Sequence, residues 1–427
     1  MSGSAYPVTL EGWLSRIEAC HPSEIELGLT RLSAVAARLP IDLSNSTRIV
    51  VAGTNGKGST LAMLDAVLRQ QGYSTGVYTS PHFLHYNERI VVNGEPVSDE
   101  LLCEVFTAIE QARGETPLTY FEYGTLAALL VFSQLKVDMA LLEVGLGGRL
   151  DAINIVDADI AVVTTVALDH MDWLGPDRES IGFEKAGVFR SGKPALCGDP
   201  DAPARLVGHA EAIAAPLCRN GIDYRYERQA DGWNWQGVSA DGVSCRYEQL
   251  PVPGLPLANA ALVMQILQFL PKPVSEAAIR QGLEQACLTG RMQRTRLGGL
   301  AVTLDVAHNP EAASYLASRL REEAGQPIHL VLGMLADKDI EAVVEQLSPV
   351  VGQWYPVTLS VPRGTDKEVL VTALQKAGVP MKAIHPAASV KSAVEYLQLN
   401  QPEGGVVIAG SFFTVAEALA LRTGASC

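Results

Sequence analysis

The chain has 427 residues, of which 33 are Lys or Arg and 47 are Asp or Glu, so its formal net charge at pH 7 is −14. A molecule with that charge repels nucleic acid and anionic membranes at long range, which argues against a basic binding module. With 48% hydrophobic and 19% charged residues and no low-complexity tract, the composition is that of a globular protein with two large domains or three small ones.

The apolar stretches and the cysteines of the sequence indicate the cellular compartment of the protein. The most apolar stretches are interrupted by Asn259, Gln265 or Glu143 before they reach a membrane-spanning length, and no basic region leads into an apolar one at the N-terminus. The seven cysteines are scattered without a CxxC pair, which argues against a disulfide framework and a structural zinc site. We therefore expect a soluble cytoplasmic protein that binds neither nucleic acid nor membrane.

In the first part of the chain, short β-branched runs alternate with segments of helical period, as in βαβ units with a parallel sheet. The expected strands are residues 48–52, 75–78, 139–144, 160–165 and 195–197. The expected helices are residues 59–71, 99–111, 123–135 and 178–189. Shorter alternation around Trp233 and Trp235 predicts a small antiparallel insertion at residues 222–247.

Two further helices are expected at residues 256–270 and 275–286. After them, a second alternation of strands and helices begins. Its expected strands are residues 301–306, 328–332, 354–357 and 406–409. The restart places a domain boundary near residues 290–297, which divides the chain into residues 1–290 and 291–427. The predicted fold is α/β, with a P-loop-type, mostly parallel sheet in the N-terminal domain and a smaller Rossmann-like C-terminal domain.

The strongest local signal is a glycine-rich turn between a predicted strand and a predicted helix. It reads Gly53, Thr54, Asn55, Gly56, Lys57, Gly58 and Ser59. Such a turn lets backbone N–H groups face a phosphate while the lysine reaches its outer oxygens. The match to the usual pattern is imperfect, because Val51 stands at its first glycine and Gly58 follows the lysine. The alternative is a tight turn with a solvated lysine.

Polar residues follow later strands, at the sheet edge where α/β proteins bind ligands. Glu143 closes an apolar strand and is either a cation-binding acid or an ordinary strand-end carboxylate. His170 follows residues 160–165 and is either a metal ligand or a structural loop histidine. Lys185 lies on the next helix, and spacing alone does not separate a surface lysine from one near a metal site.

The second half has one comparable group. Asp305, His308 and Asn309 follow a predicted strand and precede a helix, which suggests a ligand surface. Arg291, in the presumed linker, is a candidate for a nucleotide phosphate, although linkers often carry arginine for solvation.

Together these segments resemble the folylpolyglutamate synthase and dihydrofolate synthase family, relatives of the Mur ligases, and most closely its bacterial bifunctional members. The matching blocks follow the family's order: GTNGKGS at 53–59, TSPH at 79–82, TYFEYGT at 119–125, EVGLGGRLDAIN at 143–154, ALDHMDWLG at 167–175, EKAG at 184–187, GR at 290–291 and DVAHNP at 305–310. The resemblance implies a ligase that uses ATP to activate a carboxylate of dihydropteroate, tetrahydrofolate or a folate polyglutamate as an acyl phosphate. L-Glutamate then displaces phosphate and forms an amide.

The resemblance also implies roles for single residues. Lys57 and the loop amides would hold the phosphates, with Asn259, Arg291 and Asp305 as further ATP contacts. Of two Mg²⁺ ions, one would be bound by Ser80 and Glu143, with Ser59 a further candidate, and the second by His170. Lys185 is expected to carry a carbamate. The remaining assignments are to the pterin (Thr119, Tyr120, Phe121, Glu122, Leu150, Asp151 and Ala152) and to glutamate (His308 and Ser411).

Some features leave alternatives open. Residues 26–31 depart from the acidic-then-basic helix of the relatives, so we expect the entry to the pterin pocket to differ from theirs. A monofunctional folylpolyglutamate synthase and a Mur-type amino-acid ligase are the nearest alternatives, although the 52 residues before Gly53 are too few for the extra domain of the latter. A nucleotide-driven switch would instead hydrolyse ATP without any acceptor. We expect a monomer.

Overall fold

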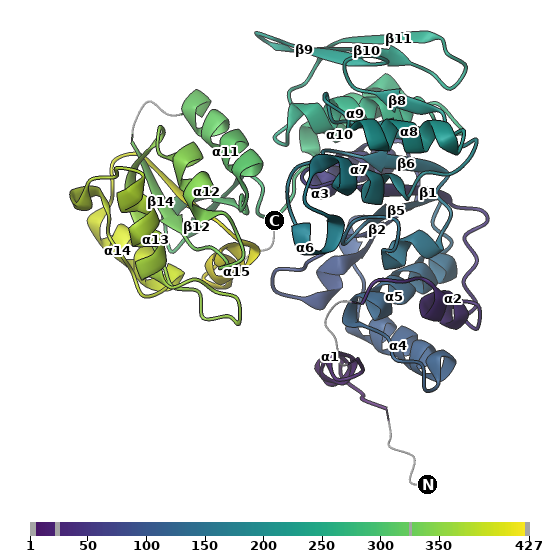
Figure 1. Ribbon diagram of the computed structural model, residues 1–427, viewed down its shortest axis with the longest axis horizontal. Helices are drawn as coiled ribbons and strands as arrows, with labels where there is room; N and C mark the ends of the chain where they lie inside the picture. Colours follow the sequence, from purple (N-terminus) through teal and green to yellow (C-terminus); the bar gives the residue numbers. More distant parts are fainter. Residues whose placement is uncertain (1–5, 22–25, 324–326, 423–427) are drawn as a thin grey trace. The chain divides into compact units, whose positions relative to one another are not determined.

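The computed structural model describes residues 6–21, 26–323 and 327–422. The chain divides into two compact units, residues 1–286 and 287–427 (Figure 1). The division falls four residues before the boundary expected from the sequence. Among the helices of the described ranges, none is long and apolar enough to cross a membrane.

The first unit is built on an eight-stranded sheet in the order β4-β3-β2-β5-β1-β6-β7-β8. The six strands from β2 to β8 in this order are parallel, and β3 and β4 continue the sheet antiparallel at one edge. Their bounds are β1 Thr47–Ala52, β2 Thr75–Tyr78, β3 Ile90–Val92, β4 Glu95–Pro96, β5 Met139–Glu143, β6 Ile160–Val163, β7 Ala195–Cys197 and β8 Leu217–Arg219. The mostly parallel sheet predicted for this part of the chain is confirmed.

Helices cover both faces of this sheet (Figure 1). Alternate strand residues point to opposite faces, so Val50, Leu142 and Val163 share one core with α4, α5, α7 and α8. The other face carries α3, α9 and α10, where α3 contacts both of the other helices. The bounds are α3 Lys57–Gln70, α4 Asp99–Arg113, α5 Tyr120–Leu135, α6 Met171–Leu174, α7 Arg178–Ala186, α8 Ala204–Ala212, α9 Leu257–Leu267 and α10 Glu276–Gln285, with short 3₁₀ turns η1 Tyr86–Arg89 and η2 Ala152–Ile155.

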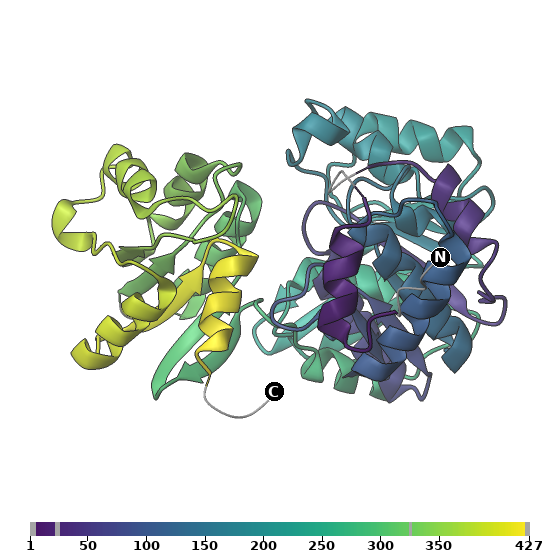
Figure 2. The ribbon, with the colours of Figure 1, turned by 90° about the horizontal axis from the view of Figure 1, so that it is seen from below.

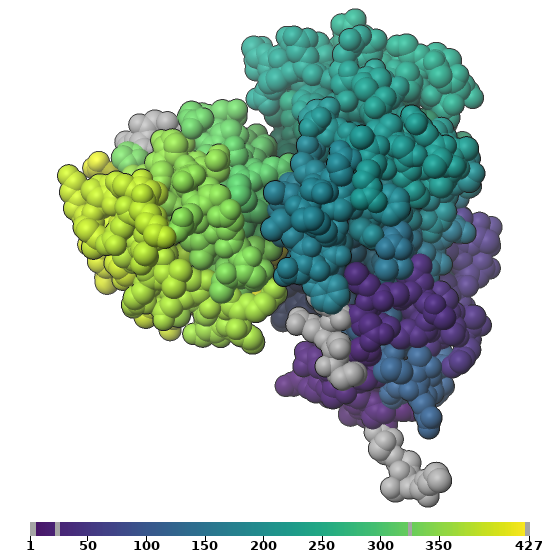
Figure 3. All heavy atoms as spheres, viewed as in Figure 1, coloured from purple at the N-terminus to yellow at the C-terminus, as the bar shows by residue number. Residues whose placement is uncertain are grey.

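Two N-terminal helices, α1 (Leu10–Glu18) and α2 (Thr30–Ala36), were not expected from the sequence. Thr9 caps α1, whose apolar side packs Trp13 at 6.0 Å from the ring of Phe106 on α4. Figures 2 and 3 show this purple N-terminal segment against the blue helices α4 and α5. The first helices therefore complete the core on the α4 and α5 side.

The antiparallel insertion is confirmed as a separate three-stranded sheet, β11-β10-β9, which lies at one end of the first unit (Figure 1). Its strands are β9 Arg225–Gln229, β10 Gly232–Val238 and β11 Ser244–Leu250. Trp235 fixes it to α9, because its indole Nε1–H donates to the backbone oxygen of Ala261 at 3.0 Å. Both Trp233 and Trp235 are buried.

The second unit contains a five-stranded sheet in the order β12-β13-β16-β14-β15, in which only the β12–β13 pair is antiparallel. Leu330, Trp354 and Val407 form its core with α11, α12 and α13. The bounds are β12 Gln293–Leu297, β13 Leu300–Asp305, β14 Ile328–Leu332, β15 Val351–Pro356, β16 Gly405–Ala409, α11 Pro310–Glu323, α12 Ile340–Leu347, α13 Lys367–Lys376, η3 Met381–Ala383, α14 Val390–Asn400 and α15 Phe412–Ala420. This is the smaller α/β unit expected.

Several predicted ends were wrong by a few residues because local caps set them. The helix expected from residue 59 begins at Lys57, directly after the left-handed Gly56. The helix expected from residue 123 begins at Tyr120, because Thr119 and Glu122 form a capping box. The helix expected to reach residue 189 ends at Ala186, and the strand expected to reach residue 165 ends at Val163.

Candidate active site

The glycine-rich turn joins β1 to α3 and requires glycine at two positions. Gly53 has φ +149° and Gly56 φ +88°, both in the region that side chains disfavour. A Cβ on Gly53 would lie 1.8 Å from Thr164 Oγ1, and one on Gly56 would lie 2.7 Å from Asn259 Oδ1. The turn is therefore packed tightly against the end of β6 and against α9, which brings the predicted ATP residue Asn259 to the loop.

The N-terminus of α3 follows this turn directly. Lys57, Gly58 and Ser59 are its first three residues, whose N–H groups have no acceptor inside the helix. The Lys57 ammonium donates to the backbone oxygens of Gly53 at 2.9 Å and Thr54 at 3.2 Å, so it lies over the loop. A helix N-terminus and a lysine at one turn form a site for an anion such as a phosphate.

Glu143 and Ser80 meet at the carboxyl edge of the sheet. Glu143 is the last residue of β5, pairs in register with Val51 of β1, and is only 6% exposed. The Ser80 N–H donates to Glu143 Oε2 at 3.2 Å. A buried carboxylate beside a serine supplies the oxygen ligands that Mg²⁺ prefers, so these two residues fit the expected metal.

His170 lies in the loop after β6, as expected, and directly precedes the short helix α6 with φ +51°. Its ring Nε2 lies 3.9 Å from Asp169 Oδ2, and its side chain is 46% exposed. In the described ranges no group of three or more His, Cys, Asp and Glu side chains is arranged to hold a metal ion. The structure thus joins Ser80 to Glu143 and places His170 beside Asp169.

Lys185 is a buried lysine: it lies on α7, and only 4% of its surface is exposed. Burial, and to a lesser degree the charge of nearby Lys57, lower its pKa to about 7, although the charges of Asp169 and Asp151 oppose the shift. The alternative of a surface lysine is wrong because Lys185 is buried, and the neighbouring Glu184 pairs with Arg149, whose Nη2 lies 2.8 Å from Glu184 Oε1. Lys185 belongs to the charge cluster around the phosphate loop.

Asp151 is the second buried charge of this cluster. Burial raises its pKa to about 6, although backbone N–H groups and Lys57 oppose the shift. Its carboxylate accepts the N–H of Leu146 at 2.8 Å and of Ile153 at 3.0 Å. These bonds hold the turn that carries Leu150 and Ala152, so the three residues predicted to contact the pterin there form one fixed segment.

The other predicted pterin residues form the start of α5. Thr119 and Glu122 cap the helix, with the Thr119 N–H donating to Glu122 Oε2 at 2.8 Å. The Tyr120 ring lies edge-on to Tyr86 at 5.6 Å, and the Arg89 guanidinium lies 5.3 Å above Tyr120. These aromatic and cationic groups can contact a planar ring.

Phe121 faces a different neighbour. Its ring lies 5.9 Å from that of Tyr78, and a Cβ on Gly145 would be 2.6 Å from its Cζ. Phe121 therefore packs into the glycine-rich segment that follows Glu143, as a core residue does.

The sequence connected residues 26–31 with the entry to the pterin pocket but assigned no role to a single residue there, and the structure places this segment against both predicted pterin segments. Arg31 forms an ion pair with Glu122 at 3.1 Å and another with Glu26, and the Gly28 N–H donates to the Leu150 oxygen at 3.3 Å. The available signal was the pair of opposite charges at Glu26 and Arg31, five residues apart. The contacts of this segment with Glu122 and Leu150 are the part of the candidate site that the sequence did not predict.

In the second unit, Asp305 and Arg291 come together. The buried Asp305 carboxylate accepts the N–H groups of Met292 and Ala307, each at 2.9 Å. Burial raises its pKa, and the charge of Arg291 opposes that shift. The Arg291 guanidinium lies 5.3 Å from the ring centre of Phe412.

The two residues predicted to bind glutamate are held by their own segments. His308 Nδ1 lies 2.9 Å from the Val306 oxygen. Ser411 is almost fully buried and caps α15, where its Oγ accepts the Thr414 N–H at 3.0 Å. Both follow the carboxyl ends of neighbouring parallel strands, β13 and β16, so they belong to one sheet edge.

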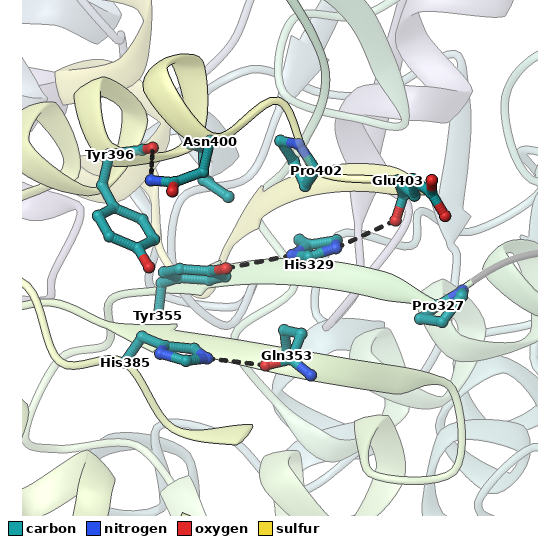
Figure 4. Close-up of a pocket in the computed structure, with 10 residues that line it drawn as sticks. Pro327, His329, Gln353, Tyr355, His385, Tyr396, Asn400, Pro402 and Glu403 are labelled. Atoms are coloured by element: carbon teal, nitrogen blue, oxygen red, sulfur yellow. Dashed lines mark hydrogen bonds between the residues drawn. The ribbon is translucent and has the colours of Figure 1, made fainter. Parts of the chain in front are cut away.

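A pocket of about 400 Å³ lies elsewhere in the second unit (Figure 4). His329, Tyr355, His385 and Tyr396 line it with their rings, and Glu403 lies at its rim. His329 is near the start of β14 and Glu403 precedes β16, whereas Asp305 and Ser411 lie at strand ends. None of the residues predicted from the sequence lines this pocket.

Comparisons with known proteins match both units. Residues 51–198 match the Mur ligase middle domain, and residues 290–412 match the Mur ligase glutamate ligase domain. The chain is 44% identical over 411 residues to the dihydrofolate synthase/folylpolyglutamate synthase of Escherichia coli strain K12, which covers 96% of this chain and 94% of that protein.

Solved structures agree with the sequence comparison. The structure of E. coli FolC with DHPP and ADP has a TM-score of 0.90 and 43% identity, covering 97% of this chain and 98% of that chain. A bifunctional folylpolyglutamate synthase/dihydrofolate synthase with Mn, AMPPNP and L-glutamate bound has a TM-score of 0.89 and 43% identity, covering 98% and 99%. The chain therefore belongs to the Mur ligases and, within them, to the dihydrofolate synthase/folylpolyglutamate synthase family.

Proposed function

We propose that this protein is an ATP-dependent ligase that joins L-glutamate to dihydropteroate, forming dihydrofolate, and to tetrahydrofolate and folate polyglutamates, lengthening their glutamate tail. The observation that carries the proposal is the 44% identity, over nearly the whole of both chains, to a relative that bears both activities in its name. The phosphate loop before α3 supports it independently, since the reaction needs a site for ATP.

The chemistry begins with a carboxylate, which is a poor electrophile because its leaving group would be an oxide. A carboxylate oxygen of the pterin substrate attacks the γ-phosphorus of ATP, the bond to the β-phosphate breaks, and ADP leaves. The amine nitrogen of L-glutamate then attacks the acyl carbon of the acyl phosphate. The carbon–oxygen bond to phosphate breaks and the nitrogen loses a proton, giving the amide and inorganic phosphate.

The protein's part in the first step is to hold the phosphates and offset the charge that moves during transfer. We assign this role to Lys57 and to the backbone N–H groups of residues 56–59. Asn259, Arg291 and Asp305 are assigned as further ATP contacts. Asn259 lies against Gly56, and the carboxylate of Asp305 is positioned by two backbone N–H groups.

Mg²⁺ would bind at two sites, one formed by Ser80 and Glu143, the other by His170. When bound, the ions supply positive charge to the phosphate oxygens. Burial of Glu143 and its contact with Ser80 support the first site. Asp169 beside His170 holds a negative charge next to the second.

We assign a carbamate to Lys185. The neutral amine attacks CO₂, a nitrogen–carbon bond forms and a proton is released, which replaces a cation with an anion. A pKa of about 7 supports the assignment, because a large fraction of the buried amine is neutral near neutral pH. A ¹³C resonance in the carbamate region after addition of ¹³C-bicarbonate, present in the native protein and absent in Lys185→Ala, is the expected result. Equal spectra would remove the carbamate from the account.

The remaining assignments concern the two organic substrates. Tyr120, with the capped turn at Thr119 and Glu122, and the segment Leu150, Asp151 and Ala152 would contact the pterin, with Phe121 supporting that segment through Gly145. His308 and Ser411 would hold L-glutamate. We also place the enzyme in the cytoplasm as a monomer, in keeping with the free cysteines found in the described part of the chain.

The acyl phosphate can be tested directly with dihydropteroate labelled with ¹⁸O in its carboxylate. If the pterin oxygen attacks ATP, one labelled oxygen must leave with the inorganic phosphate, and its mass increases accordingly. Phosphate without label, released at the same rate, would mean that ATP is hydrolysed by water. The same reaction is run with tetrahydrofolate labelled with ¹⁸O in its carboxylates. Transfer of the label to phosphate from tetrahydrofolate but not from dihydropteroate would favour the monofunctional folylpolyglutamate synthase.

A further inference from the structure

The phosphate loop is held by the segment that follows β6, rather than by its own hydrogen bonds alone. Both backbone groups of Asn55 are bound there: its N–H donates to Thr165 Oγ1 at 3.1 Å, and its oxygen accepts the Thr164 hydroxyl at 2.6 Å. The Thr54 N–H donates to the Thr165 oxygen at 2.8 Å. The two consecutive threonines therefore fix the peptide units directly before Gly56.

A further pair of bonds extends this contact along the same segment. The Thr54 hydroxyl accepts the Ala167 N–H at 3.0 Å and donates to the Ala167 oxygen at 3.3 Å. Residues 164–167 lead into Asp169 and His170, so one short segment joins the loop to the candidate metal ligand. Because the Asn55 N–H already donates to Thr165 Oγ1, the next backbone donors along the loop are the N–H groups from Gly56 onward.

The contact between Thr164 and the phosphate loop is closer than ordinary side-chain packing. Thr164 is almost fully buried, and a Cβ on Gly53 would lie 1.8 Å from its hydroxyl oxygen. The Thr164 hydroxyl also lies 3.3 Å from the Ala52 oxygen, so it touches the loop where β1 ends and again at Asn55. No side chain larger than that of glycine fits between the loop and this threonine.

We propose that Thr164 and Thr165 are positioning residues for ATP, which set the loop so that the N–H groups from Gly56 onward and Lys57 face the β- and γ-phosphates. They act through the loop and do not themselves contact the nucleotide. The inference rests on the proposed function only in taking ATP as the ligand of the loop. It extends the site to two hydroxyl groups that lie more than a hundred residues beyond the loop in the sequence.

The test compares two variants at one position. Thr164→Ala removes the hydroxyl without adding bulk, and Thr164→Ser keeps it. We expect Thr164→Ala to raise the dissociation constant of ADP, and the KM for ATP, by about five- to tenfold, the effect of one or two lost hydrogen bonds. The KM for dihydropteroate should stay within about twofold, and Thr164→Ser should behave as the native protein.

A matched control is Thr107→Ala, which removes a hydroxyl that donates to the Cys103 oxygen inside α4. This variant also loses one hydroxyl hydrogen bond within the first unit, but its ADP dissociation constant must not change. An unchanged ADP dissociation constant in a folded Thr164→Ala protein, or an equal change in Thr164→Ser or Thr107→Ala, would overturn the proposal. Calorimetric binding of ADP requires no turnover, so a native protein that binds ADP but forms no amide would contradict the ligase function and leave this test intact.

Discussion

The carboxylate of Glu110 is the centre of a buried charge network that links α1, α4 and α5. It accepts hydrogen bonds from Arg16 Nη2 at 2.6 Å and from Arg113 Nε and Nη2, each at 2.7 Å, and from the Tyr123 hydroxyl. Burial alone would raise the pKa of Glu110, but these hydrogen bonds outweigh it and lower the pKa to about 2. We therefore expect Glu110→Gln to destabilise the first unit.

The size of the effect follows from what the substitution leaves behind. A glutamine keeps the shape but has no charge, and its amide N–H groups face arginine donors. Removing one partner of a buried ion pair costs about 3–5 kcal/mol. The Arg16 side chain is 35% exposed and can be hydrated, whereas Arg113 is 16% exposed. The lower end, about 3 kcal/mol of unfolding free energy at pH 7, is therefore expected.

Glu110 also contributes to the pH dependence of the unfolding free energy in acid. Because the folded-state pKa of Glu110 lies below the ordinary value of 4.5, its contribution is fully present above pH 4.5 and is lost as the pH falls toward 2. The variant lacks this group, so its unfolding free energy should fall less over that window than that of the native protein.

Urea unfolding followed by tryptophan fluorescence, at pH values from 7 to 3, measures both quantities. Glu104→Gln is the matched control, because Glu104 lies exposed on the same helix and should change stability by less than about 0.5 kcal/mol. A loss below about 1 kcal/mol at pH 7 in Glu110→Gln, or an acid limb as steep as that of the native protein, would refute the reasoning.

Three further predictions concern the candidate site. Lys57→Ala should lower phosphate release at least about 100-fold while the protein stays folded by circular dichroism, and activity within about tenfold of native would contradict its role at the phosphates. Because burial lowers the pKa of Lys185 to about 7, its amine is largely neutral above pH 7 and protonated below. Bicarbonate added to CO₂-depleted enzyme should therefore restore activity at pH 8 and far less at pH 6, and equal restoration at both would count against the carbamate. Tyr120→Ala should raise the KM for dihydropteroate about tenfold, with the KM for ATP unchanged, and a shift in both constants would remove Tyr120 from the pterin pocket.

The parts of the site that the sequence predicted are those set by local chemistry. Gly53 to Ser59 form the expected turn because glycine is required at Gly53 and Gly56, and a helix start follows wherever such a turn ends. Glu143 ends its strand as the apolar run indicated. These features depend on neighbours in the sequence, which is why a single chain suffices to predict them.

Long-range contacts could not be predicted in this way. Nothing near Asn55 in the sequence indicates that Thr164 and Thr165 hold it. Likewise, nothing near Arg31 indicates that it pairs with Glu122. The first helix was missed for a different reason, because Leu10, Trp13 and Ile17 do show helical spacing, but over only nine residues. A segment that short gains most of its stability from packing, in this case against α4.

The most direct test of the ligase function is phosphate release by the purified protein with ATP, Mg²⁺ and L-glutamate, run with dihydropteroate, with tetrahydrofolate and with no pterin. A bifunctional ligase releases phosphate with each pterin and not without one, and each product gains the mass of one glutamate residue. Equal release in all three reactions, without a change in the mass of the pterin, would contradict the account.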